Sequence, residues 1–213
     1  MSVSAPKFRR ESAEHRREAM IRAALELVAE HGVQAATVRA IADRANVTPG
    51  LIRHYFSGKE ELIVAAYRHH MQQQYELSLA TQPDGSAIAR LRALILASLS
   101  QPVANQEAVT LWAGFINMLR DDDRMQATHE ESYVQFREVL EQLIADALIE
   151  AKRPASSPDL RQMAIASNAV IDGLWMEGGM LPSAFEPGEI GEIGLSSVGK
   201  IVGINLSNTE DTP

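Results

Sequence analysis

TVRAIADRANVTPGLIRHYFSGKEEL, residues 37–62, is the stretch with the strongest structural signal in this chain. Thr37 is a good N-cap, because its hydroxyl can accept a hydrogen bond from a free amide of the next turn. Apolar side chains then recur at helical spacing over 38–45. Thr48 is a second N-cap, and a second apolar face follows over 49–55. The stretch therefore predicts two short helices joined by a tight turn.

The second of these helices is predicted to have an outer face suited to DNA. Pro49 occupies its first position, where the missing amide hydrogen costs nothing. Gly50, Arg53 and His54 fall on the side away from the apolar residues, and a small residue beside long polar ones suits close approach to a duplex. The interpretation is a helix-turn-helix whose second helix enters the major groove. Its alternative is a helix, a turn and a helix that merely pack together in a small helical domain.

The residues that follow strengthen the DNA interpretation. Segment 57–62 ends the second helix and opens a third with an acidic first turn, as the helix dipole favours. The whole string 37–62, including its aromatic pair at 55–56, resembles the DNA-binding signature of the TetR family of bacterial transcriptional regulators. This resemblance is strongest over the first 62 residues. It implies phosphate contacts from three residues: Thr37, Tyr55 and Lys59.

Base readout is predicted to fall to Thr48, Pro49, Arg53 and His54, and Arg53 is the residue with the clearest chemistry for it. Its guanidinium can donate two hydrogen bonds to a guanine edge, a contact that contributes about 1–3 kcal/mol of discrimination. Relatives often carry a small or aromatic residue at this position, so the use of Arg53 is a hypothesis about this chain. Arg39 and Arg44 are expected to be solvated or ion-paired. The predicted DNA-contacting set is Thr37, Thr48, Pro49, Gly50, Arg53, His54, Tyr55 and Lys59.

Charge is distributed unevenly along the chain, whose net charge is -8. Residues 1–60 contain ten Lys or Arg and seven Asp or Glu, which gives +3; the remainder has ten basic and twenty-one acidic residues, which gives -11. Such asymmetry is expected where one end of a protein meets phosphate. A basic arm that contacts phosphates or the minor groove is predicted near the N-terminus, with a solvated charged end as the alternative. Its residues are Lys7, Arg9, Arg10, Arg16 and Arg17.

Composition excludes several classes of protein. Hydrophobic residues make up 46% of the 213 residues, enough for a real core. Cysteine is absent, which excludes disulfides and thiolate metal sites and fits a reducing cytoplasm. No apolar stretch approaches the ~20 residues that cross a bilayer, and the N-terminus lacks the apolar segment of a signal peptide. We therefore expect a soluble, cytoplasmic protein that does not enter a membrane.

An all-α fold is predicted, because no convincing strand pattern occurs in the sequence. About nine helices are expected, over residues 12–31, 38–45, 49–55, 59–80, 86–100, 105–120, 125–152, 159–180 and 188–205. They divide into an N-terminal three-helix head and a larger helical body. The predicted domains are a helix-turn-helix DNA-binding domain over 1–58 and a ligand-binding and dimerisation domain over 59–206, followed by a disordered tail over 207–213.

Pairing of two chains is predicted through the last two helices. Single helix-turn-helix heads bind weakly, so such proteins pair and span two half-sites about one turn apart. Glycine destabilises a helix by about 1 kcal/mol relative to alanine. Its lack of a side chain is an advantage only where another helix approaches closely. The glycines in question are Gly188, Gly191, Gly194, Gly199 and Gly203. The side chains expected to fill the seam are Ile190, Ile193, Leu195, Val198, Ile201 and Val202. The alternative is a loosely ordered tail.

A ligand site is predicted in the body. Trp112 and Phe115 share one expected helix, Tyr133 lies on the next, and Asp172 precedes Trp175 by one turn on another. The alternative is that these aromatic rings simply pack a helical core. Together, aromatic rings and a carboxylate indicate a site for a small organic cation, through ring quadrupoles and charge.

Two strings in the body extend the resemblance. AVTLWAGF at 108–115 and VIDGLW at 170–175 are similar to the BetI branch of the TetR family. Members of that branch include repressors of choline-to-betaine genes that respond to choline, although Asp-Gly-Leu-Trp also occurs in relatives with other ligands. The ligand-binding residues that the resemblance implies are Trp112, Phe115, Tyr133, Asp172 and Trp175.

The predicted function is a ligand-responsive transcriptional repressor. It would bind palindromic operator DNA as a homodimer and be released by a small molecule, choline or another organic cation, that favours a different spacing of the heads. The alternatives on the same fold are an activator and a sensor of a neutral or acidic metabolite. No cofactor is expected. An enzyme or a metal sensor is disfavoured, because no nucleophile has a nearby base and the adjacent pair His69-His70 points to different helix faces.

Overall fold

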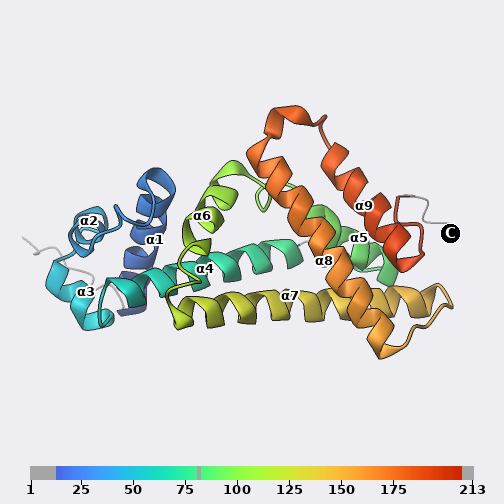
Figure 1. The fold of residues 1–213 in the computed structure, drawn as a ribbon, viewed down its shortest axis with the longest axis horizontal. Coiled ribbons are helices and arrows are strands. Elements are labelled where there is room, and N and C mark those ends of the chain that lie inside the picture. The colour runs from blue at the N-terminus through green and yellow to red at the C-terminus, as the bar shows by residue number, and fades with distance from the viewer. Residues whose placement is uncertain (1–12, 81–82, 208–213) are drawn as a thin grey trace, which may run out of the picture. The chain divides into compact units, whose positions relative to one another are not determined.

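The computed structural model describes residues 13–80 and 83–207, and within them nine α-helices and one short 3₁₀ turn form the fold (Figure 1). The helices are α1 (Ala13–His31), α2 (Val38–Arg44), α3 (Pro49–Tyr55), α4 (Lys59–Leu79), α5 (Ala87–Ser98), α6 (Gln106–Ile116), α7 (Asp123–Glu150), α8 (Ser157–Met180) and α9 (Glu189–Val202), with η1 (Pro182–Ala184) before α9. This arrangement confirms the predicted all-α fold. None of the helices in these ranges is long and apolar enough to cross a membrane.

The chain folds as two compact units that divide between Tyr67 and Arg68, inside α4. The first unit, which we call the head, is built from α1, α2, α3 and the start of α4. Its core is made of aliphatic side chains that are almost fully buried, since each short helix turns one apolar face inward. These side chains include Met20, Ile21, Ala24, Ile41, Ile52, Leu62 and Ile63.

The predicted N-terminal arm is only partly within the described residues. Lys7, Arg9 and Arg10 lie outside them. Arg17 lies in α1, where its guanidinium carbon stands 5.4 Å from the centre of the Phe56 ring. Such stacking holds a cation on an aromatic face. Arg17 therefore lies in the first helix of the head, within the helix expected over 12–31, and its contact with phosphate stays a prediction.

The second unit, which we call the body, packs α5, α7, α8 and α9 around one core. Its centre is formed by side chains such as Leu91, Leu94, Leu140, Ile144, Leu195 and Val198. The chain runs along α8 to η1 and returns along α9, which packs against both α8 and α5 (Figure 1). The predicted tail beyond Ser207 lies outside the described residues.

Two of the glycines that were assigned to a seam with a second chain, Gly191 and Gly194, face α5 of the same chain. A β-carbon added at Gly191 would stand 3.0 Å from Leu96, and one added at Gly194 would collide with Leu99, both on or at the end of α5 of the same chain. Gly188 and Gly203 cap α9 at φ of +85° and +72°, a left-handed conformation that glycine adopts most readily. Close helix approach was correctly predicted, but the approaching helix is the chain's own α5.

The apolar residues assigned to the same seam also belong largely to the body's own core. Leu195, Val198 and Val202 are buried, and Ile190 and Ile201 pack partly buried against that core. Only Ile193 of the predicted set is markedly exposed, at 38%.

Candidate nucleic-acid interface and ligand cavity

The turn between α2 and α3 is short because its backbone is closed by hydrogen bonds. The amide of Ala45 donates to the Ile41 carbonyl at 2.8 Å, and that of Val47 donates to the Ala42 carbonyl at 2.9 Å. Asn46 between them has φ of +52°, a left-handed conformation that asparagine tolerates better than most residues. This closure sets α3 directly after α2, as in a helix-turn-helix.

Threonine hydroxyls cap both helices, as the sequence predicted. The Thr37 hydroxyl accepts a hydrogen bond from the Ala40 amide at 3.2 Å, and the Thr48 hydroxyl accepts one from the Leu51 amide, also at 3.2 Å. Each hydroxyl keeps its own proton free to donate, because in the cap it acts only as an acceptor. Both threonines are exposed, so both can donate to a phosphate.

The outer face of α3 is exposed, whereas its inner face is held by the fully buried Ile52. Arg53 is exposed and has no hydrogen-bond or ion-pair partner among the described residues, so its guanidinium is free to meet an external acceptor. Exposed neighbours surround it on this face: Thr48, Pro49, Gly50 and His54.

Tyr55 and Lys59 are anchored within the head rather than fully free. Tyr55 is half-buried, and the His54 ring meets its edge with 5.5 Å between ring centres. The Lys59 ammonium donates to the Val33 carbonyl at 3.1 Å, which ties the start of α4 to the loop before α2. An ammonium has three donors, so this bond leaves capacity for a phosphate.

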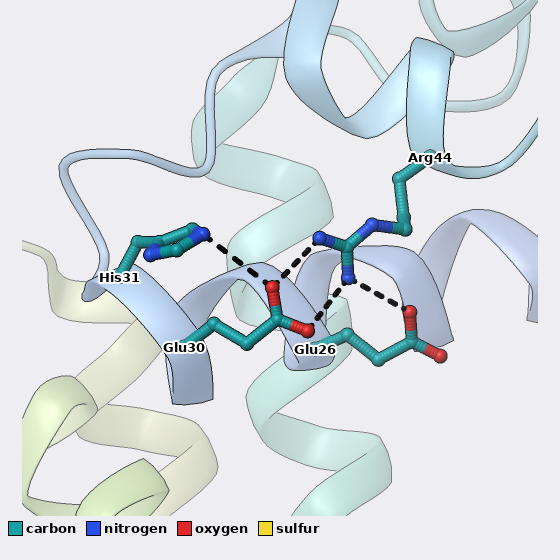
Figure 2. A network of polar contacts seen from close by, with 4 residues as sticks. All are labelled: Glu26, Glu30, His31 and Arg44. Carbon is teal, nitrogen blue, oxygen red and sulfur yellow. Dashed lines mark hydrogen bonds and ion pairs between the residues drawn. The ribbon is translucent and has the colours of Figure 1, made fainter.

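Arg44 is ion-paired, one of the two outcomes predicted for it (Figure 2). Its guanidinium donates to both carboxylate oxygens of Glu30, at 3.0 and 2.7 Å, and to Glu26 at 3.2 Å. The hydrogen bond from Arg44 lowers the pKa of Glu30, against a smaller opposing effect of burial. Arg44 thus joins α2 to α1 and is not available as a DNA reader.

A cavity of about 100 Å³ lies in the body between α4, α6, α7 and α8. Four of the five predicted ligand residues line it: Trp112, Tyr133, Asp172 and Trp175. The fifth, Phe115, is fully buried and lies outside the lining. Further residues of the lining include His70, Gln74, Phe136 and Asn168. The fold thus brings together side chains that are far apart in the sequence.

The two tryptophans form a fixed aromatic corner of this cavity. Their rings meet edge to face, with 6.1 Å between ring centres and 82° between ring planes. The Trp175 indole donates to the Val103 carbonyl at 2.9 Å, which holds the ring in place. Rings of this kind attract a cation through the negative potential of their faces.

Asp172 supplies the only carboxylate in the lining. Burial raises its pKa to about 6, against smaller opposing effects from the Asn168 hydrogen bond and the charge of Arg137. The Asn168 amide donates to the carboxylate at 2.9 Å. Burial also raises the pKa of Tyr133 to about 12, and the Asp172 charge adds to the shift. At pH 7 the cavity therefore holds one largely buried negative charge beside neutral phenol and indole groups.

His70 was missed as a lining residue. It is 3% exposed, and burial, assisted by the charge of His69, lowers its pKa to about 4. It is therefore neutral at pH 7 and does not repel a cation. His69 is exposed, so the prediction that the two histidines face different sides of the helix is confirmed. The spacing of His70, Gln74 and Ser78 along one face of α4 was the available signal.

Two family models match this chain. The model of the tetR family of bacterial regulatory proteins matches residues 20–66, and that of the C-terminal part of BetI-type transcriptional repressors matches residues 87–203. The HTH-type transcriptional regulator BetI of Pseudomonas aeruginosa is 30% identical over 181 residues, 82% of this chain and 86% of that protein.

Solved structures have the same fold. A transcriptional regulator from Pseudomonas aeruginosa PAO1 superposes with a TM-score of 0.81 at 30% identity, over 92% of this chain and 95% of that one. A transcriptional regulator from Saccharomonospora viridis, solved in complex with choline, has a TM-score of 0.68 at 16% identity, over 90% and 97% of the two chains. Because the BetI-type model alone spans more than half of the sequence, this chain belongs to the TetR family of bacterial transcriptional regulators, in its BetI-type branch.

Proposed function

We propose that this regulator represses transcription by binding palindromic operator DNA as a homodimer, and that a small organic cation releases it. The observation that carries the proposal is the Asp172 carboxylate, largely buried among aromatic rings with one hydrogen bond from Asn168. A buried charge costs free energy unless it is paired. A cation in the cavity would supply the pairing, while the rings of Trp112 and Trp175 would surround its apolar groups.

The size of the cavity favours a small effector. Its volume is about 100 Å³, well below the roughly 300–1,000 Å³ of pockets that hold drug-sized ligands. Choline is the first candidate to test, since relatives carry the name BetI and a more distant structure with this fold holds choline. The neutral or acidic metabolite that the sequence left open would place no positive charge beside Asp172.

Helix α4 offers a route from cavity to DNA. It is one uninterrupted helix that begins with Lys59 in the head (Figure 1). His70 and Gln74 in its second half line the cavity. An effector that prefers one position of this half over another would shift the equilibrium between head positions. Only one spacing of the two heads in a dimer matches successive major grooves.

The surface for the second chain is proposed to follow α8. Apolar or small side chains repeat along one side of this helix at intervals of three and four residues, and we call this set the α8 stripe: Ile165, Ala169, Gly173, Met176 and Met180. Ile165 is 36% exposed and Met180 is 63% exposed in the single chain. Ile193 of α9 is exposed as well. Pairing two copies would remove this apolar surface from water.

Operator release by a charged ligand tests the proposal. An operator is selected from a random duplex library, and its binding is followed by fluorescence anisotropy while ligands are added. We expect choline to raise the melting temperature of the protein and to weaken operator binding. The neutral isostere 3,3-dimethylbutan-1-ol, which has the same shape without the charge, should do neither. Equal effects of the two ligands would contradict a cation site.

Arg53→Ala is expected to remove preference at one operator position. If Arg53 reads guanine with two donors, its loss should reduce discrimination there by about 10- to 100-fold and leave the other positions unchanged. Lys59→Ala is the matched comparison and should weaken binding to all sequences alike, because a phosphate contact carries no sequence information. Repeating the selection with each variant measures both effects. A uniform loss for Arg53→Ala would make Arg53 a phosphate contact.

A further inference from the structure

Asn168 is a polar residue at a position of α8 where an apolar one would be expected. It is 7% exposed, and its neighbours Ala164 and Ile171 belong to the core of the body. Asparagine is a weak helix former, and burying its amide costs free energy unless the amide is hydrogen-bonded. Here the side-chain NH₂ group donates to a carboxylate oxygen of Asp172 at 2.9 Å, one helical turn later. The polar residue in this buried place is therefore paired with the charge of the proposed cation site.

Few other groups near Asp172 could help to keep its carboxylate ionised. In the lining, α4 contributes His70, which is neutral at pH 7, and Tyr75. Helix α7 contributes Tyr133, and α6 contributes no ionisable group to the described lining. Arg137 of α7 is a cation whose charge reaches Asp172. Its guanidinium donates to the Tyr133 carbonyl at 3.3 Å, and no ion pair joins it to Asp172 within the described ranges.

The Asn168 hydrogen bond favours the form of Asp172 that attracts a cation. A hydrogen bond to an ionised acceptor is roughly twice as strong as one between neutral groups, so it stabilises the carboxylate against protonation. It lowers the pKa of Asp172 by more than the charge of Arg137 does, against the larger opposing effect of burial. The apparent affinity for an effector scales with the fraction of the protein in the competent form, which is here the ionised one.

We propose that Asn168 is a positioning residue of the cation site, which acts on the effector only through the Asp172 carboxylate that it holds in the charged form. This inference rests on the proposed function, because it concerns the same site. Removing the amide should weaken cation binding at acidic pH and leave it unchanged at a pH where Asp172 is fully ionised. A residue that contacted the effector, or that only packed the core, would instead change the affinity at every pH.

Choline titrations of the full chain between pH 5.5 and 8.5 test this role. Asn168→Leu replaces the amide with a branched side chain that has no donor. It should raise the midpoint of the pH dependence by about one pH unit from its wild-type value of about 6. Relative to the wild-type protein, choline affinity should then fall about fivefold at pH 6, about twofold at pH 7 and not measurably at pH 8.5. Gln162→Leu removes an exposed amide from the same helix and should leave the midpoint unchanged.

Carbon-13 NMR of the free protein, with labelled aspartate, measures the same midpoint without an effector. The Asp172 signal is assigned by its absence from Asp172→Asn, and its midpoint should rise in Asn168→Leu and in the smaller variant Asn168→Val. An unchanged midpoint, or a loss of choline affinity that is equal at every pH, overturns the role of Asn168 alone. If the wild-type protein binds no organic cation, the proposed function fails and the role of Asn168 in binding fails with it.

Discussion

Asp172→Asn should abolish the response to organic cations and, at neutral pH, make the protein more stable. The carboxylate is the one negative charge in the cavity lining, so its loss removes the partner of the cation. Truncating one member of a buried charge pair costs about 2–5 kcal/mol, so the affinity for choline should fall by roughly 30-fold or more. Titration calorimetry with the variant and the wild-type protein measures the loss.

The gain in stability follows from the direction of the pKa shift. Burial raises the pKa of Asp172 from 3.8 to about 6, so the folded protein favours the protonated form more strongly than the unfolded chain does. Near pH 3.8 and below, Asp172 is protonated in both states and burial of its charge costs nothing. As the pH rises from 3.8 to 6 the unfolded chain ionises more readily, and stability is progressively lost. Above pH 6 the full penalty applies, about 1–3 kcal/mol after allowing for partial exposure to solvent.

Denaturant unfolding at a series of pH values tests whether the Asp172 charge destabilises the folded protein. Asp172→Asn should be more stable than the wild-type protein above pH 6, and the difference should shrink toward zero near pH 4. Choline should reduce the difference in stability between the two proteins at pH 7.5, because it stabilises only the wild-type protein. Asp121→Asn is the matched control, since Asp121 is highly exposed and should change neither property. A variant that is less stable at pH 7.5 would mean that the carboxylate is already well paired in the free protein.

Choline affinity should also depend on pH in the wild-type protein. Only the ionised carboxylate attracts the cation, so affinity should be nearly constant above pH 7 and fall about tenfold per pH unit well below pH 6. The same titrations on Asp172→Asn should show no such decline. His70 does not mimic this effect, because its lowered pKa of about 4 keeps it neutral over the range.

Local signals explain why so much of the fold was predictable. The caps at Thr37 and Thr48 depend on residues three positions apart, so they operate identically in a short peptide and in the folded head. The helical spacing of apolar residues likewise records which face is buried. In the cavity, Trp112 and Trp175 were grouped from their aromatic character and from the resemblance, and the fold places their ring centres 6.1 Å apart.

The features that the sequence did not predict are those that depend on how the helices pack against one another. Gly194 correctly indicated close approach to another helix, but nothing local distinguishes α5 of the same chain from a helix of a second chain. Gln74 was overlooked for the same reason: its face of α4 is polar enough to pass for a solvated surface until α6, α7 and α8 enclose it. Phe115 shows the converse, since an aromatic residue near Trp112 in sequence lies in the core instead of the cavity wall.

Ala169→Glu is expected to separate the dimer and to remove tight operator binding. Ala169 is exposed at the middle of the α8 stripe, one helical turn from Ile165 and from Gly173. In a two-fold pair the same surface of both chains meets, so the two introduced carboxylates would be brought together in an apolar seam. The cost of burying them should favour the single chain.

Mass and operator affinity should change together in this variant. Light scattering should report 23.3 kDa for Ala169→Glu and twice that, 46.6 kDa, for the wild-type protein. Operator affinity should fall by at least about 100-fold, because a single head contacts only one half-site. Ala127→Glu makes the same substitution at an exposed alanine of α7 and should preserve both mass and binding. A folded Ala169→Glu protein that remains dimeric would show that the second chain binds a surface other than the α8 stripe, since two like charges cannot share an apolar seam without a measurable loss of association.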